Sequence, residues 1–163
     1  MKTLLLIRHA KSSWDNLSLS DFERPLNGRG KADAPEMAKR IKEKKIKIDL
    51  FVSSPAKRAK KTAKIFMEVY DADKKNLLLI PSLYEASVQN FYNAIDLIDD
   101  KYDTIAVFSH NPGITEFANS LTEYQVDNIP TCGAFAVSIK IKKWSEFKNA
   151  DKELLFLDFP KNG

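Results

Sequence analysis

The chain has 163 residues, 44% of them hydrophobic and 29% charged, which fits a single globular domain with a core of ordinary size. Lysine and arginine outnumber aspartate and glutamate by 26 to 22, and so small a surplus favours anionic partners without indicating nucleic acid. The only cysteine, Cys132, excludes an internal disulfide and suits a reducing compartment. The apolar run Leu4–Ile7 is too short for a signal peptide or a membrane span. We therefore expect one domain over residues 1–163, a monomer in the cytoplasm without membrane contact.

Predicted strands and helices alternate along the chain. The aliphatic run Thr3–Arg8 predicts a strand that is buried on both faces, and the polar residues 11–30 predict a long ordered loop. Further strands are predicted at residues 48–53, 77–80, 104–109, 134–141 and 154–159. Helices are predicted at residues 29–45, 55–70, 88–98 and 113–121, the second of them with Ser54 as its cap and Pro55 at its first position. This order predicts an α/β fold, a three-layer sandwich with a mostly parallel central sheet flanked by helices.

The candidates for catalysis and ligand binding, two histidines and two arginines, follow the predicted strands. Arg8-His9 ends the first strand, Ser109-His110 ends the fourth, and Arg58 lies one turn into the helix after the second. Ligands of open α/β sheets bind beyond the carboxyl ends of the strands. A single histidine at a strand end is more often structural. Because both histidines of the chain fall at equivalent strand ends, with two arginines beside them, the constellation indicates a functional site.

Several other kinds of site are excluded by spacing. Two histidines and one cysteine lack the paired spacing of a zinc site. A cysteine phosphatase needs an arginine six positions after its nucleophile, where this chain has Ser138 after Cys132. A Gly-x-Ser-x-Gly elbow and a glycine-rich nucleotide loop are also absent. What remains is an anion pocket with a nucleophile. The planar guanidinium group of arginine matches the geometry of phosphate oxygens. Its charge also lowers the pKa of a nearby imidazole, which can then attack phosphorus in its neutral form.

Three blocks carry a specific resemblance to a known family. They are LIRHA (residues 6–10), SSPAKRA (residues 53–59, followed by Thr62-Ala63) and SHNPG (residues 109–113). In order and spacing these blocks resemble the histidine phosphatase superfamily, which has the phosphoglycerate mutase-like fold. The form Arg-His-Ala, together with DFERPL (residues 21–26), is similar to the SixA-like phosphohistidine phosphatase branch.

The resemblance implies a role for each residue of the constellation. His9 would carry the phosphoryl group in a covalent intermediate, while Arg8, Arg58 and His110 would bind and neutralise the phosphoryl oxygens. Ser12, in the loop that follows His9, is a further candidate for binding the substrate. Neither a metal nor an organic cofactor is expected.

Three positions bear on how far the resemblance extends. The segment Leu83-Tyr84-Glu85 resembles the one that delivers a catalytic carboxylate in larger members of the family, so Glu85 is either a general acid or an exposed loop carboxylate. Ala10 replaces the glycine of the wider superfamily, a change that the SixA-like branch shares. Asp15 stands where mutase-like members often have asparagine, which weakens any expectation that this side chain contacts phosphate.

The predicted substrate is a phosphorylated protein. No stretch of the chain looks like the lid insertions that enclose small metabolites in larger relatives, so the resemblance implies a shallow, open pocket. We therefore expect hydrolysis of phosphohistidine on a signalling or phosphotransfer protein. A small-molecule phosphomonoesterase of the same mechanism is the alternative. A basic helix face at Lys57–Lys64 leaves a third hypothesis, a binding module for nucleic acid or an acidic protein, although such runs are usually solvated.

Overall fold

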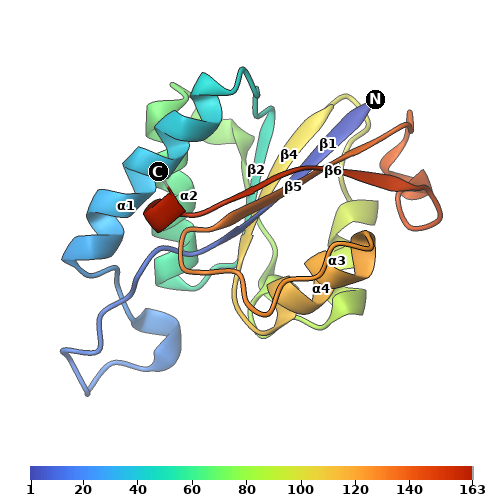
Figure 1. Ribbon diagram of the computed structural model, residues 1–163. Coiled ribbons are helices and arrows are strands. Elements are labelled where there is room, and N and C mark those ends of the chain that lie inside the picture. Colours follow the sequence, from blue (N-terminus) through green and yellow to red (C-terminus); the bar gives the residue numbers. More distant parts are fainter. Residues whose placement is uncertain (163) are drawn as a thin grey trace.

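The computed structural model describes residues 1–162 and contains a six-stranded sheet between two pairs of helices (Figure 1). The strands are β1 (Lys2–Arg8), β2 (Leu50–Ser53), β3 (Leu77–Leu79), β4 (Thr104–Ser109), β5 (Ala134–Ile139) and β6 (Lys152–Asp158). The helices are α1 (Gly28–Glu43), α2 (Lys57–Val69), α3 (Val88–Asp96) and α4 (Gly113–Leu121). The strand order is β3-β2-β4-β1-β5-β6. The four strands β1, β2, β3 and β4 are parallel to one another, whereas β5 is antiparallel to both of its neighbours, β1 and β6. The predicted α/β fold with a mostly parallel central sheet is confirmed.

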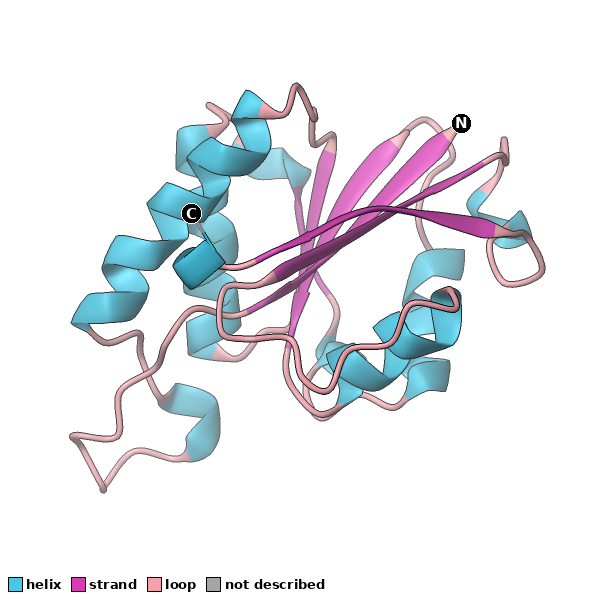
Figure 2. Cartoon of the chain, viewed as in Figure 1, coloured by secondary structure: helices cyan, strands magenta, loops and turns pink. Residues whose placement is uncertain are grey.

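Side chains that alternate along the strands build two separate cores, one on each face of the sheet. Leu4 and Leu6 of β1 pack with the residues of α3 and α4, whereas Leu5 and Ile7 pack with those of α1 and α2. Each strand residue therefore points to the opposite face from its neighbour. Figure 2 shows the resulting three layers, with one helix pair on either side of the sheet. A sheet covered on both faces accounts for the continuous aliphatic run in β1.

The strand register places the ends of β1, β2 and β4 together. Arg8 is paired with Ser109, and Ser53 is paired with Phe108. Because these strands run in parallel, the residues that follow each of them leave the sheet at the same edge. His9, Ser54 and His110 are those residues. No helix among residues 1–162 is both long and apolar enough to cross a membrane.

The start of α2 differs from the prediction. The helix begins at Lys57 with Ala56 as its cap, and no side chain caps it. Ser54 instead directly follows β2, and its hydroxyl accepts a hydrogen bond from the Ala56 backbone N–H at 3.2 Å. The Ser-Pro pair resembles a helix start, but Ser54 is irregular and residues 55–56 form a bend before the helix, which leaves Ser54 at the edge of the sheet.

The start of α4 packs unusually closely against the loop between β3 and α3. A Cβ atom added at Gly113 would lie 2.2 Å from the carbonyl oxygen of Ala86. Real Cβ atoms do not approach a backbone oxygen so closely, so this contact requires glycine. The segment that precedes α4 contains His110, and the loop contains Tyr84 and Glu85. Gly113 therefore sets the distance between two sides of the predicted site.

We predict that Gly113→Ala destabilises the protein by about 2 kcal/mol, because the new methyl group pushes the loop away from α4. The free energy of unfolding in urea measures the effect. Gly28→Ala is the matched control, since nothing lies within 4 Å of a Cβ atom at that helical position, and it should be neutral or stabilise by less than about 1 kcal/mol. Equal stability of the two variants would contradict the prediction.

Candidate active site

His9 directly follows β1, and a hydrogen bond fixes which of its two ring nitrogens carries the proton. Its Nδ1 lies 2.7 Å from the carbonyl oxygen of Ala10. A carbonyl oxygen only accepts, so Nδ1 carries the proton and the lone pair of the neutral ring is on Nε2. Burial lowers the pKa of His9 to about 3, with His110 and the two arginines adding to the decrease and the Ala10 contact opposing it. The imidazole is therefore a neutral base with a fixed tautomer at physiological pH.

Arg58, on the first turn of α2, contacts Nε2 of His9 directly. Its Nε lies 3.3 Å from His9 Nε2. Thr62 joins the two segments, since its hydroxyl accepts from the Ala10 N–H at 3.0 Å and donates to the Arg58 carbonyl oxygen at 2.7 Å. Positions 58 and 62 are one helical turn apart, which allows this contact. The backbone that carries the histidine is thus bonded to the helix that carries the arginine.

His110, which follows β4, lies beside His9. The centroids of the two rings are 5.2 Å apart. His110 Nε2 is 2.8 Å from the hydroxyl oxygen of Ser54, which also accepts from the Ala56 N–H. When the Ser54 hydroxyl donates to Nε2, the proton of the neutral ring is on Nδ1. Nδ1 is a buried atom without a hydrogen-bond partner among residues 1–162, and burial lowers the pKa of His110 to about 4.

Arg8 contributes a second guanidinium group with unused donors. Its Nη1 donates to the Ile129 carbonyl oxygen at 3.0 Å, while its buried Nε has no partner within the described part of the chain. Burial and the nearby charge of Arg58 lower the pKa of Arg8. The backbone carbonyl oxygens of Arg8 and His9 both accept from the Cys132 N–H at 3.0 Å. Buried unpaired donors are rare in native proteins, and two of them beside His9 indicate a place for an anion.

A cavity of about 350 Å³ opens beside these side chains. Its lining comes from four parts of the chain: Asp21, Arg58, Tyr84, Glu85, Ala86, His110, Asn111, Pro112 and Gly113. Glu85 is exposed on this wall and has a positive φ of 55°. The structure therefore brings His9, Arg58 and His110 together, with Arg8 adjoining them, and places Glu85 at the edge of the cavity.

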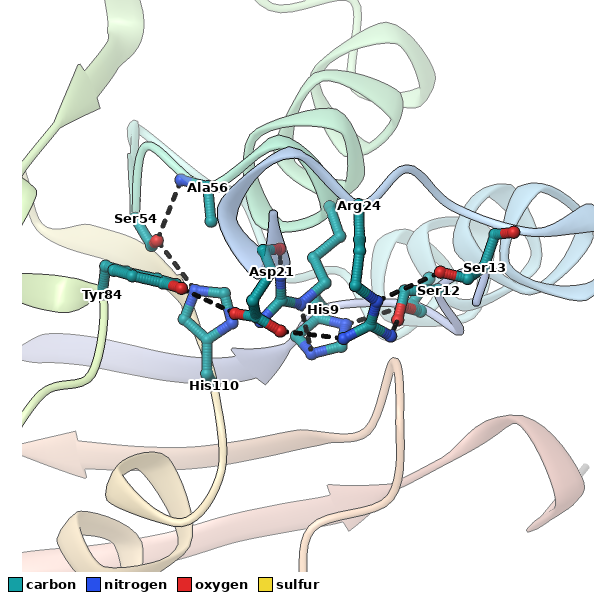
Figure 3. Close-up of polar contacts among 11 residues, drawn as sticks. His9, Ser12, Ser13, Asp21, Arg24, Ser54, Ala56, Tyr84 and His110 are labelled. Atoms are coloured by element: carbon teal, nitrogen blue, oxygen red, sulfur yellow. Dashed lines mark hydrogen bonds and ion pairs between the residues drawn. The ribbon is translucent and has the colours of Figure 1, made fainter. Parts of the chain in front are cut away.

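A network of side chains around Asp21 was not anticipated from the sequence. Its carboxylate accepts hydrogen bonds from the Tyr84 hydroxyl at 2.6 Å and from Arg58 Nη2 at 3.0 Å on one oxygen, and from Arg24 Nη1 at 2.9 Å on the other. Arg58 Nη1 also donates to the Asp21 carbonyl oxygen at 2.6 Å. Figure 3 shows Asp21 above the space between the two imidazoles. The conspicuous signal in this part of the sequence was the DFERPL block, but nothing in it indicates which side chain reaches the site.

The hydrogen bond between Tyr84 and Asp21 shifts the pKa values of these two groups in opposite directions. The hydrogen bond from Tyr84 and those from the two arginines lower the pKa of Asp21 to about 2. The same bond to Asp21 raises the pKa of Tyr84 to about 12. Asp21 is therefore a stable anion at the mouth of the site and a poor proton donor.

Ser12 does not join this group. Its hydroxyl accepts from Nη2 of Arg24, and Figure 3 shows both residues on the side of His9 that is away from His110. Arg24 also donates through Nε to the Ser13 carbonyl oxygen at 3.1 Å. In this structure Ser12 positions Arg24, which in turn contacts Asp21.

The described residues include no group of three or more histidine, cysteine, aspartate or glutamate side chains that could hold a metal ion. Cys132 is buried, and burial raises the pKa of its thiol. The residues at the site are mainly hydrogen-bond donors with positive or neutral charge, an arrangement suited to an oxyanion.

Comparison with known families and sequences gives consistent results. The model of the histidine phosphatase superfamily (branch 1) matches residues 4–92. An uncharacterized chloroplastic protein of Arabidopsis thaliana is 34% identical over 153 residues, which cover 89% of this chain and 70% of that protein. A 2,3-bisphosphoglycerate-dependent phosphoglycerate mutase of Bartonella henselae is 34% identical over 86 residues, covering 52% of this chain and 42% of the mutase.

Solved structures share the fold over nearly the whole chain. The protein histidine phosphatase SixA complexed with tungstate has a TM-score of 0.83 and 20% identity, with 98% of each chain covered. A phosphoserine phosphatase of Entamoeba histolytica in complex with 3-phosphoglyceric acid has a TM-score of 0.66 and 18% identity, with 97% of each chain covered. The phosphoglycerate mutase-like fold is confirmed, and proteins with different substrates have it.

The depressed pKa values of the two histidines predict an acid-sensitive fold. Both imidazoles resist protonation in the folded state but accept a proton near pH 6.5 when unfolded, so the unfolded state binds more protons below that pH. The free energy of unfolding should therefore fall as the pH decreases from 7 to 5, by up to about 2 kcal/mol for each histidine.

Urea unfolding at pH 7, 6 and 5 measures this loss, and NMR of the ring protons should find both imidazoles neutral above pH 5. The control is a double variant, His9→Gln with His110→Gln, which leaves no histidine in the chain and should lose most of the pH dependence. A wild-type protein that is equally stable at pH 7 and pH 5 contradicts the prediction.

Proposed function

This chain belongs to the histidine phosphatase superfamily, and we propose that it hydrolyses phosphohistidine on a protein through a phosphoryl intermediate on His9. The observation that carries the proposal is the fixed tautomer of His9, whose proton lies on Nδ1 against the Ala10 carbonyl oxygen while Nε2 faces Arg58. Nδ1 is then occupied by a proton, so Nε2 is the nitrogen left to attack phosphorus.

In the first step the lone pair of His9 Nε2 forms a bond to phosphorus while the bond from phosphorus to the leaving group breaks. The ring becomes a cation in the intermediate, and its Nδ1–H donates to the Ala10 carbonyl oxygen 2.7 Å away. Water then attacks phosphorus, the electron pair of the N–P bond returns to Nε2, and phosphate leaves. Covalent catalysis of this kind divides one difficult transfer into two easier ones.

Three side chains would hold the phosphoryl oxygens. Arg58 uses three of its donors on His9 and Asp21, which leaves one N–H on each terminal nitrogen. Arg8 Nε and His110 Nδ1 are two of the three buried side-chain atoms that lack a hydrogen-bond partner within residues 1–162, and the third, Asp33 Oδ2, belongs to α1. Fixed donors around a transferring phosphoryl group supply much of the rate acceleration in such reactions. We assign the binding of phosphoryl oxygens to Arg8, Arg58 and His110.

The electrostatics at the mouth of the cavity favour a phosphohistidine substrate. A phosphorylated imidazole that is protonated on its other nitrogen leaves as neutral imidazole, so the reaction needs no acid from the protein. Asp21, ionised and close to Arg58, would attract such a cation and repel a leaving group that carries a carboxylate or a second phosphate. The connection between β3 and α3 is also short, spanning residues 80–87, which keeps the cavity open to a group on a protein surface.

A second candidate, a small-molecule phosphomonoesterase of the same mechanism, is favoured by one observation. An alcohol leaving group requires a proton, and Glu85 lines the cavity. We prefer the phosphohistidine substrate because Asp21, rather than Glu85, makes contact with Arg58. The related SixA and phosphoserine phosphatase structures support both substrate classes equally, since each shares only the fold with this chain.

We predict that His9→Ala abolishes turnover of a phosphohistidine protein and of phosphoramidate, with a decrease of at least about 10³-fold, because the nucleophile is missing. Wild-type enzyme quenched during turnover and separated on a denaturing gel should carry a phosphoryl group that is labile in acid and stable in base. The control His110→Ala should form the same adduct slowly, since it retains His9. Recovery of the adduct at the wild-type level on His9→Ala would exclude His9 as the nucleophile.

Removal of the charge of Asp21 should alter which leaving groups are accepted. We predict that Asp21→Asn changes the ratio of kcat/KM for 3-phosphoglycerate to that for phosphoramidate about fivefold in favour of 3-phosphoglycerate, because the repulsion of an anionic leaving group is lost from a half-exposed site. The ratio cancels any general loss from weaker anchoring of Arg58. An unchanged ratio would refute the electrostatic argument, and better wild-type turnover of a metabolite than of any phosphohistidine protein would favour the phosphomonoesterase.

A further inference from the structure

The outer side of α2 carries a row of lysines that the proposed reaction does not use. Lys57, Lys60, Lys61 and Lys64 follow the spacing of one helix face. Two more lysines, one on α1 and one just before β3, extend this surface. We call the six residues the α2 lysine face: Lys31, Lys57, Lys60, Lys61, Lys64 and Lys74.

Two grooves run along the α2 lysine face. One, of about 450 Å³, lies between the helix and the loop residues Pro25 and Leu26, with Lys31 at its edge. The other, of about 530 Å³, continues along the helix past Met67 to Lys74. Both are larger than the cavity of about 350 Å³ beside His110. The surface is therefore hollowed as well as charged.

The charges of the α2 lysine face are not neutralised by the protein itself. In the part of the chain that the structure describes, the side chains of these six lysines have no carboxylate within 4.0 Å and make no hydrogen bond. Among the described lining residues, the first groove has no carboxylate and the second has one, that of Glu68. The chain has a formal net charge of +4, so without these six lysines it would carry −2. Such a concentration of like charge repels itself and attracts anionic surfaces.

The position of the α2 lysine face connects it to the active site. Lys57 directly precedes Arg58, and Lys64 lies about 10 Å further along the helix by its rise per residue. Pro25 and Leu26, which line the first groove, follow Arg24 in the loop that carries Asp21. The α2 lysine face is therefore close enough for a large molecule to contact it while presenting a phosphoryl group to His9.

We propose that the α2 lysine face is the docking surface for an acidic face of the phosphoprotein substrate, an inference that rests on the proposed function. The chemistry of the grooves favours protein over nucleic acid. Their apolar lining is aliphatic, with Leu26, Met67 and Leu77, and neither groove as described includes an aromatic side chain on which bases stack. Long-range attraction between opposite charges mainly accelerates encounter and orients the partners.

The test compares two triple variants with equal changes in charge. The first, Lys60→Ala with Lys61→Ala and Lys64→Ala, removes the middle of the α2 lysine face and retains Lys57 beside Arg58. The control changes Lys101, Lys140 and Lys142 to alanine. These three are exposed and lie at the opposite edge of the sheet, before β4 and after β5. The probes are a small acidic protein phosphorylated on histidine with phosphoramidate, the same protein with its acidic face neutralised, and phosphoramidate itself.

We expect the α2 variant to reduce kcat/KM for the acidic phosphoprotein about tenfold, mainly through KM, and to flatten the dependence of this rate on salt. Its hydrolysis of phosphoramidate and of the neutralised phosphoprotein should stay within about twofold of wild type. The control variant should match the wild type on all three probes.

Other outcomes overturn the inference in distinguishable ways. Equal losses in both triple variants would mean that net charge alone acts, and no loss in either would mean that the α2 lysine face does not dock the substrate. Loss of oligonucleotide binding in the α2 variant, with unchanged phosphoprotein kinetics, would make the partner a nucleic acid. Wild-type enzyme that hydrolyses phosphoramidate but no phosphohistidine protein would refute the proposed function itself.

Discussion

The parallel pairing of β1 with β4 is the constraint on which the active site depends. Its register sets Arg8 opposite Ser109, so the next residue on each strand leaves the sheet at the same edge. The two histidines are separated by 101 positions in the sequence, yet their ring centroids are 5.2 Å apart. A shift of the pairing by one residue would turn the side chains of β1 to the wrong face of the sheet and separate the two rings.

Hydrogen bonds to a neighbouring carbonyl oxygen and to a serine hydroxyl give these two rings the properties that the proposed nucleophile and anion site require. Ala10 fixes the proton of His9, and Ser54 holds Nε2 of His110, which leaves the buried Nδ1 without a partner in the described part of the chain. Burial keeps both rings neutral. The two neutral imidazoles can lie next to each other and to two arginines at a modest electrostatic cost, whereas two imidazolium ions could not.

Asp21 adds a negative charge to a site whose other charged groups are mainly arginines. It partly neutralises Arg58, whose terminal nitrogens both contact it, and its own charge is held by the Tyr84 hydroxyl and Arg24. Positive charge therefore surrounds the proposed place of the phosphoryl group, while an anion lies at the entrance. Further out, the α2 lysine face is positive again, so the charge alternates from the nucleophile to the surface. A substrate that fits all three zones has a phosphoryl group, a leaving group without negative charge and an acidic surrounding surface.

Much of the fold was predictable from the sequence because local patterns govern it. The aliphatic run of β1 and the apolar spacing of α1, α3 and α4 indicated the elements, with bounds within a few residues of those observed. The positions of His9, Arg58 and His110 after strands indicated a common edge, because parallel strands place their carboxyl ends together. The start of α2 was mispredicted because Ser54-Pro55 satisfies the local rules for a helix cap, but the Ser54 hydroxyl contacts His110, 56 residues away.

The sequence by itself determined the class of the fold and indicated candidate side chains for binding a phosphoryl group, since both follow from short-range periodicity and residue chemistry. Only the tertiary structure decided the tautomer of His9, the depressed pKa values of the histidines and the place of Asp21 over the site. The pKa values and the place of Asp21 depend on contacts between segments distant in the chain, such as the bond from Tyr84 to Asp21 across 63 positions. The tautomer depends on the backbone conformation that brings the carbonyl oxygen of the neighbouring Ala10 to Nδ1 of His9. A local pattern does not encode which distant donor comes within 3 Å of an acceptor, because that distance is set by the packing of the layers as a whole.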